Sequence, residues 1–124
     1  MEFKIDTKPS YTLIAPVTNE LNAKLTEAIR QKWEELTNLG SKNFIVDLHN
    51  CLNADINCFA ELMRLHEDCY NVSMSLVFTN INDDVMTTIK DNDLDLSINI
   101  APTMIEAVDI VSMEILERDL FNEE

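Results

Sequence analysis

Residues 44–59 of the chain read Phe-Ile-Val-Asp-Leu-His-Asn-Cys-Leu-Asn-Ala-Asp-Ile-Asn-Cys-Phe. The apolar run that opens this stretch has the length of a buried strand, and we expect a strand over 43–48. A polar loop follows it. Asp55 is a residue type that caps helices, because its carboxylate accepts hydrogen bonds from free backbone N–H groups. The stretch therefore predicts a buried strand, a loop and a helix over about 56–70.

The flanking segments continue this alternation of strands and helices. Residues 2–8 alternate in polarity, with Phe3, Ile5 and Thr7 on one face, and 11–17 read as a second strand, so the chain is expected to open with a hairpin. The remaining expected elements are a helix over 23–38 capped by Asn22, a strand over 73–79, a short helix from Asp83, a loop over 91–95, a strand over 96–100 and a final helix after Thr103. The order ββαβαβαβα predicts an α/β domain, a mostly parallel sheet with helices packed on it.

Length and charge limit the classes of partner. A chain of 124 residues fits one domain. Residues 1–50 carry six Lys/Arg and seven Asp/Glu, a net charge of -1, whereas 51–124 carry three Lys/Arg and sixteen Asp/Glu, a net charge of -13. Such a field repels a phosphate backbone and an anionic lipid surface, so we expect no nucleic-acid partner.

The sequence lacks the patterns of export and of membrane insertion. No apolar run approaches the ~20 residues that cross a bilayer, and the first residues have no signal-peptide pattern. Three cysteines without a Cys-x-x-Cys pair do not suggest a disulfide framework. We expect a cytoplasmic protein without membrane insertion and without a cofactor.

These features resemble the STAS family, the anti-sigma-factor antagonists. In that family a strand ending near Val-Asp-Leu leads through a loop to Asp-Ser-Ser-Gly-Leu at a helix start, and residues 55–59, Asp-Ile-Asn-Cys-Phe, take those places here. Residues 19–23, Asn-Glu-Leu-Asn-Ala, are similar to the family's Gly-Glu-Leu-Asp-Ala before the first helix. The resemblance covers about 2–112 and implies a single STAS-like domain, which leaves 113–124 as an acidic C-terminal helical extension.

The resemblance also implies a function. It predicts a non-catalytic bacterial regulator of transcription that binds a protein partner, an anti-sigma factor or a related kinase-like switch protein. The alternative is a STAS-like scaffold subunit of a larger signalling or lipid-transport assembly. The expected partner-binding residues are Asn22, His49, Asn53, Asp55, Ile56, Asn57, Cys58, Asn80 and Asp83.

The second Ser of the family motif is the usual regulatory phosphosite, and Asn57 stands in its place. A phosphate at a helix start gains backbone N–H partners, yet it places about two negative charges in a binding face. Asn57 has no hydroxyl to phosphorylate, and no Ser or Thr lies between Ser41 and Ser73. The sequence therefore predicts that the phosphorylation switch is lost at this position.

Two other chemistries fit the sequence less well. Asp47 and Thr79 follow strands as the site residues of a receiver domain do, but Pro9 and Ser10 stand where such a domain needs an acidic pair, and no Lys follows Lys90. The chain also carries candidate metal ligands: His49, Cys51, Cys58, His66 and Cys69. Cys58 and Cys69 share a helical stripe with two leucines, where Cys acts as a small hydrophobe, so we expect neither a metal nor a catalytic Cys.

Apolar residues continue along the expected last helix, with Ile115, Leu116, Leu120 and Phe121 beyond the end of the resemblance. The extension either folds back on its own sheet or packs against another chain. We favour self-association, because these side chains would otherwise form an unexplained exposed patch. The many carboxylates of the segment predict that such a homodimer is weak.

Overall fold

A five-stranded sheet forms the centre of the computed structural model, which describes residues 1–122. Its strands, in spatial order, are β1 (Phe3–Thr7), β2 (Thr12–Pro16), β4 (Asn43–Asp47), β6 (Ser75–Thr79) and β7 (Ile100–Ala101). The helices are α1 (Ala23–Asn38), α2 (Phe59–Asn71), α3 (Asp83–Asp91) and α4 (Met104–Asn122). Two short strands, β3 (Glu20–Leu21) and β5 (Asn53–Ala54), form a separate sheet, and the 3-10 turns are η1 (Ile56–Cys58) and η2 (Leu94–Leu96).

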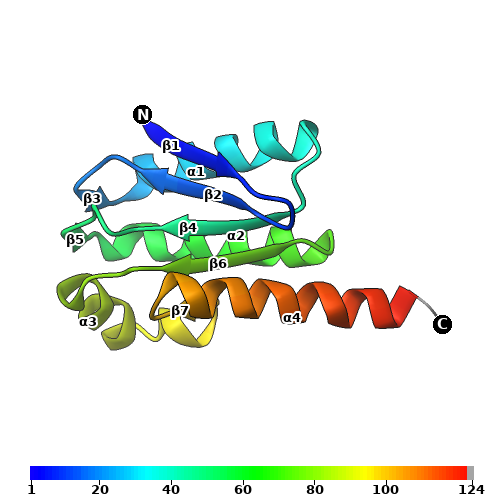
Figure 1. Ribbon diagram of the computed structural model, residues 1–124. Coiled ribbons are helices and arrows are strands. Elements are labelled where there is room, and N and C mark those ends of the chain that lie inside the picture. The colour runs from blue at the N-terminus through cyan, green and yellow to red at the C-terminus, as the bar shows by residue number, and fades with distance from the viewer. Residues whose placement is uncertain (123–124) are drawn as a thin grey trace.

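The sheet confirms the predicted hairpin and the predicted parallel order. β1 pairs antiparallel with β2, whereas β2, β4, β6 and β7 run parallel to one another. Pro16 is the last residue of β2, where its missing N–H disturbs the ladder least. The order β1-β2-β4-β6-β7 leaves β1 at one outer edge (Figure 1).

Helices cover both faces of the sheet (Figure 1). On one face Phe44, Val46 and Phe78 join the large core with α1, α2 and α3. On the other face Ile45 and Val77 pack against α4. Because β4 is buried on both faces, its sequence is a continuous apolar run rather than an alternation.

The expected strand over 96–100 is wrong in its extent. Asp93 adopts a left-handed conformation (φ 58°), which turns the chain into η2 and places Leu94 and Ile98 in the core. Leu96 is 79% exposed. Only Ile100 and Ala101 then reach β6. Most of the expected strand is therefore a turn that buries two side chains.

The last helix is longer than the resemblance implied. α4 passes through 112–113 without a break and ends at Asn122. Arg118 donates hydrogen bonds to Asn43 Oδ1 (2.6 Å) and Ser75 Oγ (3.0 Å), so the helix folds back on its own sheet at least this far. Leu116, Leu120 and Phe121 stay exposed. Glu123 and Glu124, part of the expected acidic extension, lie outside the described residues.

Polar side chains from α2 and α4 meet at the edge of β6, where β7 is too short to pair. Tyr70 donates a hydrogen bond to Glu114 Oε1 at 2.7 Å, and the Asn99 amide donates to the Tyr70 hydroxyl at 2.6 Å. The backbone N–H of Leu76 also contacts the Tyr70 hydroxyl, at 3.4 Å. His66 Nε2 accepts the backbone N–H of Asn99 at 3.1 Å. The Tyr70 hydroxyl thereby satisfies the Leu76 N–H on a stretch of β6 that β7 does not reach.

Candidate functional site

Three loops meet at the end of the sheet where the parallel strands finish. They are residues 17–22 after β2, 48–58 after β4 and 80–83 after β6, and we call this surface the loop pole (Figure 1). Parallel strands carry their carboxyl ends to the same edge of a sheet, which is where α/β domains usually place their sites. Residues far apart in the sequence are thereby brought together.

The small sheet of β3 and β5 sets the spacing of the first two loops. Leu21 pairs with Ala54, and the backbone N–H of Asp55 donates to the Leu21 carbonyl oxygen at 2.8 Å. Asn22 and Asp55, the residues that follow these strands, both begin helical segments. Two-residue strands have no periodicity, so the sequence analysis did not find this pair.

Side-chain caps fix each helical start at the pole. Asn22 Oδ1 accepts the Leu25 N–H at 2.9 Å, as predicted for the cap of α1. Asp55 Oδ1 accepts the Asn57 N–H at 3.0 Å, but the capped segment is the 3-10 turn η1, and α2 begins only at Phe59. α3 begins at Asp83, as predicted, and its cap is the preceding Asn82, whose Oδ1 accepts the Val85 N–H at 2.9 Å.

The pole exposes apolar side chains within a polar rim. Leu52 is 59% exposed and Ile56 is 52% exposed, and both flank the exposed Asn53 and Asn57. The sequence analysis selected Ile56 but missed Leu52, although an apolar residue in a polar loop is itself a signal of a binding surface. Apolar contacts surrounded by polar ones are typical of protein interfaces.

No protein-family model and no curated protein matches the sequence. Solved structures do match. A Thermotoga maritima protein described as a candidate anti-sigma factor antagonist superposes with a TM-score of 0.74 at 17% identity, over 89% of this chain and 94% of that one. The anti-sigma factor antagonist SpoIIAA, in its unphosphorylated form, gives 0.66 at 18% identity, over 90% and 96%. The chain has the STAS fold.

A larger protein contains the same fold. The murine anion transporter Slc26a9 superposes with a TM-score of 0.69 at 16% identity, over 84% of this chain and 18% of the transporter. The STAS fold therefore occurs both in small antagonists and as one part of a transporter. No helix in residues 1–122 is long and apolar enough to span a membrane.

One of the expected partner-binding residues, Cys58, does not lie on the surface. Cys58 is fully buried, with Sγ 3.7 Å from the Leu21 carbonyl oxygen, so its side chain does not reach the surface. Cys51 and Cys69 are buried as well. Burial raises the pKa of the Cys51 thiol to about 11 and of the Cys69 thiol to about 12, and it also raises the pKa of Cys58. The helical stripe that predicted core positions for Cys58 and Cys69 is confirmed.

Asp47 and His49 lie together at the end of β4. Asp47 Oδ1 accepts the backbone N–H of His49 at 3.0 Å and lies 2.9 Å from His49 Nδ1. The His49 side chain is 56% exposed. Thr79 is buried and donates to the Ala101 carbonyl oxygen at 2.8 Å. Asp47 and Thr79, the two residues compared above with a receiver domain, therefore both bond nearby backbone groups at the ends of their strands.

The third loop is tied to the second. Asn80 has a left-handed backbone (φ 56°), which turns the chain after β6. The Asn82 amide then donates to the Cys51 carbonyl oxygen at 2.8 Å, and the Asn50 amide donates to the Pro16 carbonyl oxygen at 3.3 Å. The sequence analysis overlooked Asn50 and Asn82. Asp83, which follows Asn82, is exposed. These bonds hold the three loops as one surface.

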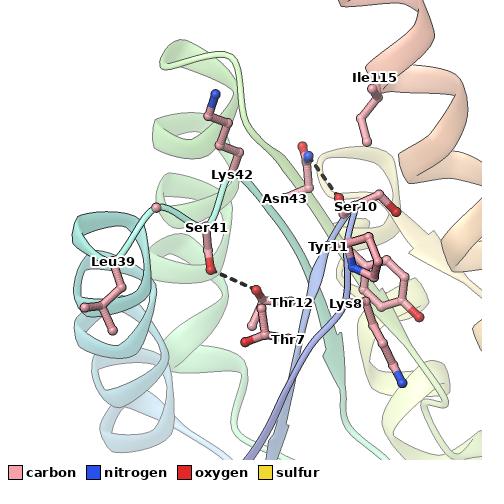
Figure 2. A pocket seen from close by; sticks show the side chains of 12 residues that line it. Thr7, Lys8, Ser10, Tyr11, Thr12, Leu39, Ser41, Lys42, Asn43 and Ile115 are labelled. Atoms are coloured by element: carbon pink, nitrogen blue, oxygen red, sulfur yellow. Dashed lines mark hydrogen bonds between the residues drawn. The ribbon is translucent and has the colours of Figure 1, made fainter.

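Other parts of the described structure are weaker candidates for a functional site. In residues 1–122 no group of three or more His, Cys, Asp or Glu side chains is arranged to hold a metal ion. At the opposite end of the sheet a hollow of about 460 Å³ lies between the β1–β2 turn and the segment before β4 (Figure 2). Two pairs of its polar groups bond each other: Thr12 Oγ1 lies 2.8 Å from Ser41 Oγ, and the Asn43 amide donates to the Ser10 carbonyl oxygen at 3.2 Å. The loop pole is therefore the stronger candidate.

Proposed function

We propose that the protein is a non-catalytic regulator that uses its loop pole to bind an anti-sigma factor or a related kinase-like switch protein. The observation that carries the proposal is that two apolar side chains, Leu52 and Ile56, are exposed in the loop that also exposes Asn57. The fold adds support, because solved structures that share it include anti-sigma factor antagonists. In this proposal the protein acts in the bacterial cytoplasm as part of transcriptional regulation.

The pole has the composition of a contact surface for a protein. Leu52 and Ile56 would be buried at the centre, where apolar contacts contribute most of the binding energy. His49, Asn53 and Asp83 would form a polar rim. The net charge of -14 favours a partner with a basic surface, since opposite charges speed association and exclude acidic competitors.

Asn57 makes this regulator insensitive to serine phosphorylation at the usual position. Its side chain is exposed in η1, just before α2, where a phosphoserine would lie near the positive end of the helix dipole. An uncharged amide in this place keeps the surface permanently in a form comparable to the unphosphorylated one. Binding would then be controlled by the amount of protein or by its partner.

The second candidate is a scaffold subunit of a larger signalling or lipid-transport assembly. It is favoured by the structural match to one part of an anion transporter. A scaffold would also make use of the loop pole, but its partner would be a membrane transporter subunit. The class of the partner therefore separates the two candidates.

Co-purification of a tagged chain from its native cells tests the proposal. We expect an ATPase-fold kinase or anti-sigma factor to be recovered, and to be lost from a Leu52→Asp/Ile56→Asp variant. A Leu39→Asp/Val72→Asp variant is the matched control, because these exposed apolar residues follow α1 and α2 at the other end of the sheet. Recovery of transporter subunits would support the scaffold. A partner unaffected by the pole variant would place the interface elsewhere.

A further inference from the structure

The free edge of β1 carries a self-complementary pattern of charge. The residues around it read Glu2-Phe3-Lys4-Ile5-Asp6-Thr7-Lys8, so charges of opposite sign lie at equal distances on either side of Ile5. In the described residues β1 pairs only with β2, and its other side is open. We propose that this edge binds a second copy of the chain, through antiparallel pairing of β1 with β1 about a two-fold axis at Ile5.

The hydrogen bonds to β2 determine which backbone groups point outward. Val17 N–H donates to the Glu2 carbonyl oxygen at 2.9 Å, and Lys8 N–H donates to the Tyr11 carbonyl oxygen at 2.8 Å. In an antiparallel ladder such pairs alternate, so Glu2, Lys4, Asp6 and Lys8 direct their backbone groups toward β2. The N–H and C=O groups of Phe3, Ile5 and Thr7 therefore point away from the sheet.

One register pairs all three outward residues with one another and also matches every charge. Pairing Ile5 with Ile5 of the second copy makes Phe3–Thr7, Ile5–Ile5 and Thr7–Phe3 the hydrogen-bonded pairs. Lys4 then faces Asp6 at a non-hydrogen-bonded position, where opposing side chains are closest. Shifting the axis to Lys4 or Asp6 keeps the outward bonds but places like charges opposite each other. The charges therefore select the register centred on Ile5.

Charged residues on an edge strand usually prevent pairing with other strands. Here they cannot prevent this pairing, because Lys4 and Asp6 would attract their counterparts. The exposure of an apolar side chain also favours pairing at this edge, since Ile5 at its centre is 37% exposed. In the proposed dimer it would contact its own symmetry mate.

The distribution of net charge is compatible with this arrangement. Each chain carries -14, which opposes association in general. However, β1 belongs to the first fifty residues, whose net charge is -1, while the acidic α3 and α4 lie toward the other edge of the sheet (Figure 1). Pairing through β1 holds the acidic halves apart. Two five-residue strands bury little surface, so we expect a weak and reversible dimer.

Reversal of single charges gives a direct test. In Lys4→Asp, two aspartates face each other twice across the axis, and in Asp6→Lys two lysines do so. Each variant alone should dimerise at least about tenfold more weakly than the wild-type chain. Mixing the two should restore the dimer, because every Asp of one chain then faces a Lys of the other. Lys90→Asp, the same charge change on exposed α3, is the matched control and should dimerise as the wild-type chain does.

Ile5→Pro provides a second, backbone test. It removes an N–H that points outward and no bond to β2, so the fold should persist while the dimer is lost. Sedimentation velocity over increasing concentration, up to about 1 mM, measures all of these chains. A wild-type chain that stays monomeric over this range would overturn the proposal. So would a dimer that survives Ile5→Pro, or two charge variants that fail to associate when mixed.

Discussion

Asp55 holds Asn57 in place in η1, the turn before α2: the carboxylate Oδ1 accepts the backbone N–H of Asn57 at 3.0 Å. The bond closes a short turn that leaves the Asn57 side chain exposed while Cys58, the next residue, is buried. An uncharged side chain, that of Asn57, thus lies next to the capping carboxylate, where the STAS motif has its second Ser. The first prediction follows from this replacement of Ser by Asn57.

The wild-type chain should not accept phosphate in η1, just before α2, from a serine kinase directed at STAS proteins. Asn57→Ser should accept one phosphate, because it restores a hydroxyl at an exposed position. Intact-mass analysis with peptide mapping after incubation with kinase and ATP measures both. Phosphate mapped to 49–60 in the wild-type chain, for example on His49, would contradict the prediction. Outside that range, the peptide that contains the Thr18 hydroxyl should also be checked for phosphate. Thr18 lies at the loop pole, because the carbonyl oxygen of the neighbouring Asn19 accepts the Leu52 N–H.

The buried cysteines should behave as core residues. Cys58→Ala or Cys69→Ala should lower the free energy of unfolding by about 1 kcal/mol, as small core truncations do. Chemical denaturation measures the loss. Stoichiometric zinc in the purified protein that disappears in Cys69→Ala would refute the core assignment.

The cysteines also predict how stability depends on alkaline pH. Burial raises the pKa of the thiols of Cys51 and Cys69 from 9.0 to about 11 and about 12 in the folded chain. The unfolded chain therefore releases these protons first, and stability should fall as pH rises above about 9. The fall should be smaller in Cys69→Ala. An equal fall in both chains would mean that Cys69 contributes nothing to it.

The Tyr70 hydroxyl should contribute to stability as the centre of a hydrogen-bonded cluster. Tyr70→Phe leaves Glu114, Asn99 and the Leu76 N–H without their common partner and should cost about 1–3 kcal/mol. Tyr11→Phe is the matched control, since the Tyr11 hydroxyl makes no side-chain hydrogen bond within residues 1–122. Equal unfolding free energies for the two variants would show that the cluster is not stabilising.

The element pattern could be predicted from the sequence because most elements are long enough to show a period. The apolar stripe that contains Cys58 and Cys69 placed both residues in the core correctly. The resemblance put Cys58 on the partner-binding surface instead, because it carries over positions and not side-chain directions. Periodicity was the better guide at this residue.

The remaining features depend on contacts that sequence spacing does not encode. The β3–β5 pair rests on two residues from each of two distant loops. The turn at Asp93 requires a left-handed residue that no glycine marks, and the bond from Asn99 to His66 joins residues 33 apart. Leu52 was missed for another reason, since a single apolar residue in a loop carries no period.

Acidic pH should weaken the chain through His66. Burial lowers the pKa of His66, although the Glu114 carboxylate acts to raise it. The neutral ring accepts a hydrogen bond from the Asn99 N–H. The stability contributed by the neutral His66 ring is therefore present above the ordinary histidine pKa of about 6.5 and is lost as pH falls below it. The difference in unfolding free energy between the wild-type chain and His66→Gln should shrink from about pH 8 to about pH 5. A difference independent of pH would contradict this.

The affinity of the loop pole for its native partner tests the central proposal most directly. Asn57→Glu places a negative charge where a phosphoserine would lie, and calorimetry should show binding weakened by about 1–3 kcal/mol through repulsion and desolvation. Asn71→Glu makes the same change at the exposed far end of α2 and should leave the affinity unchanged. Circular dichroism should show both variants folded. Equal affinity of Asn57→Glu and the wild-type chain would contradict binding through the loop pole.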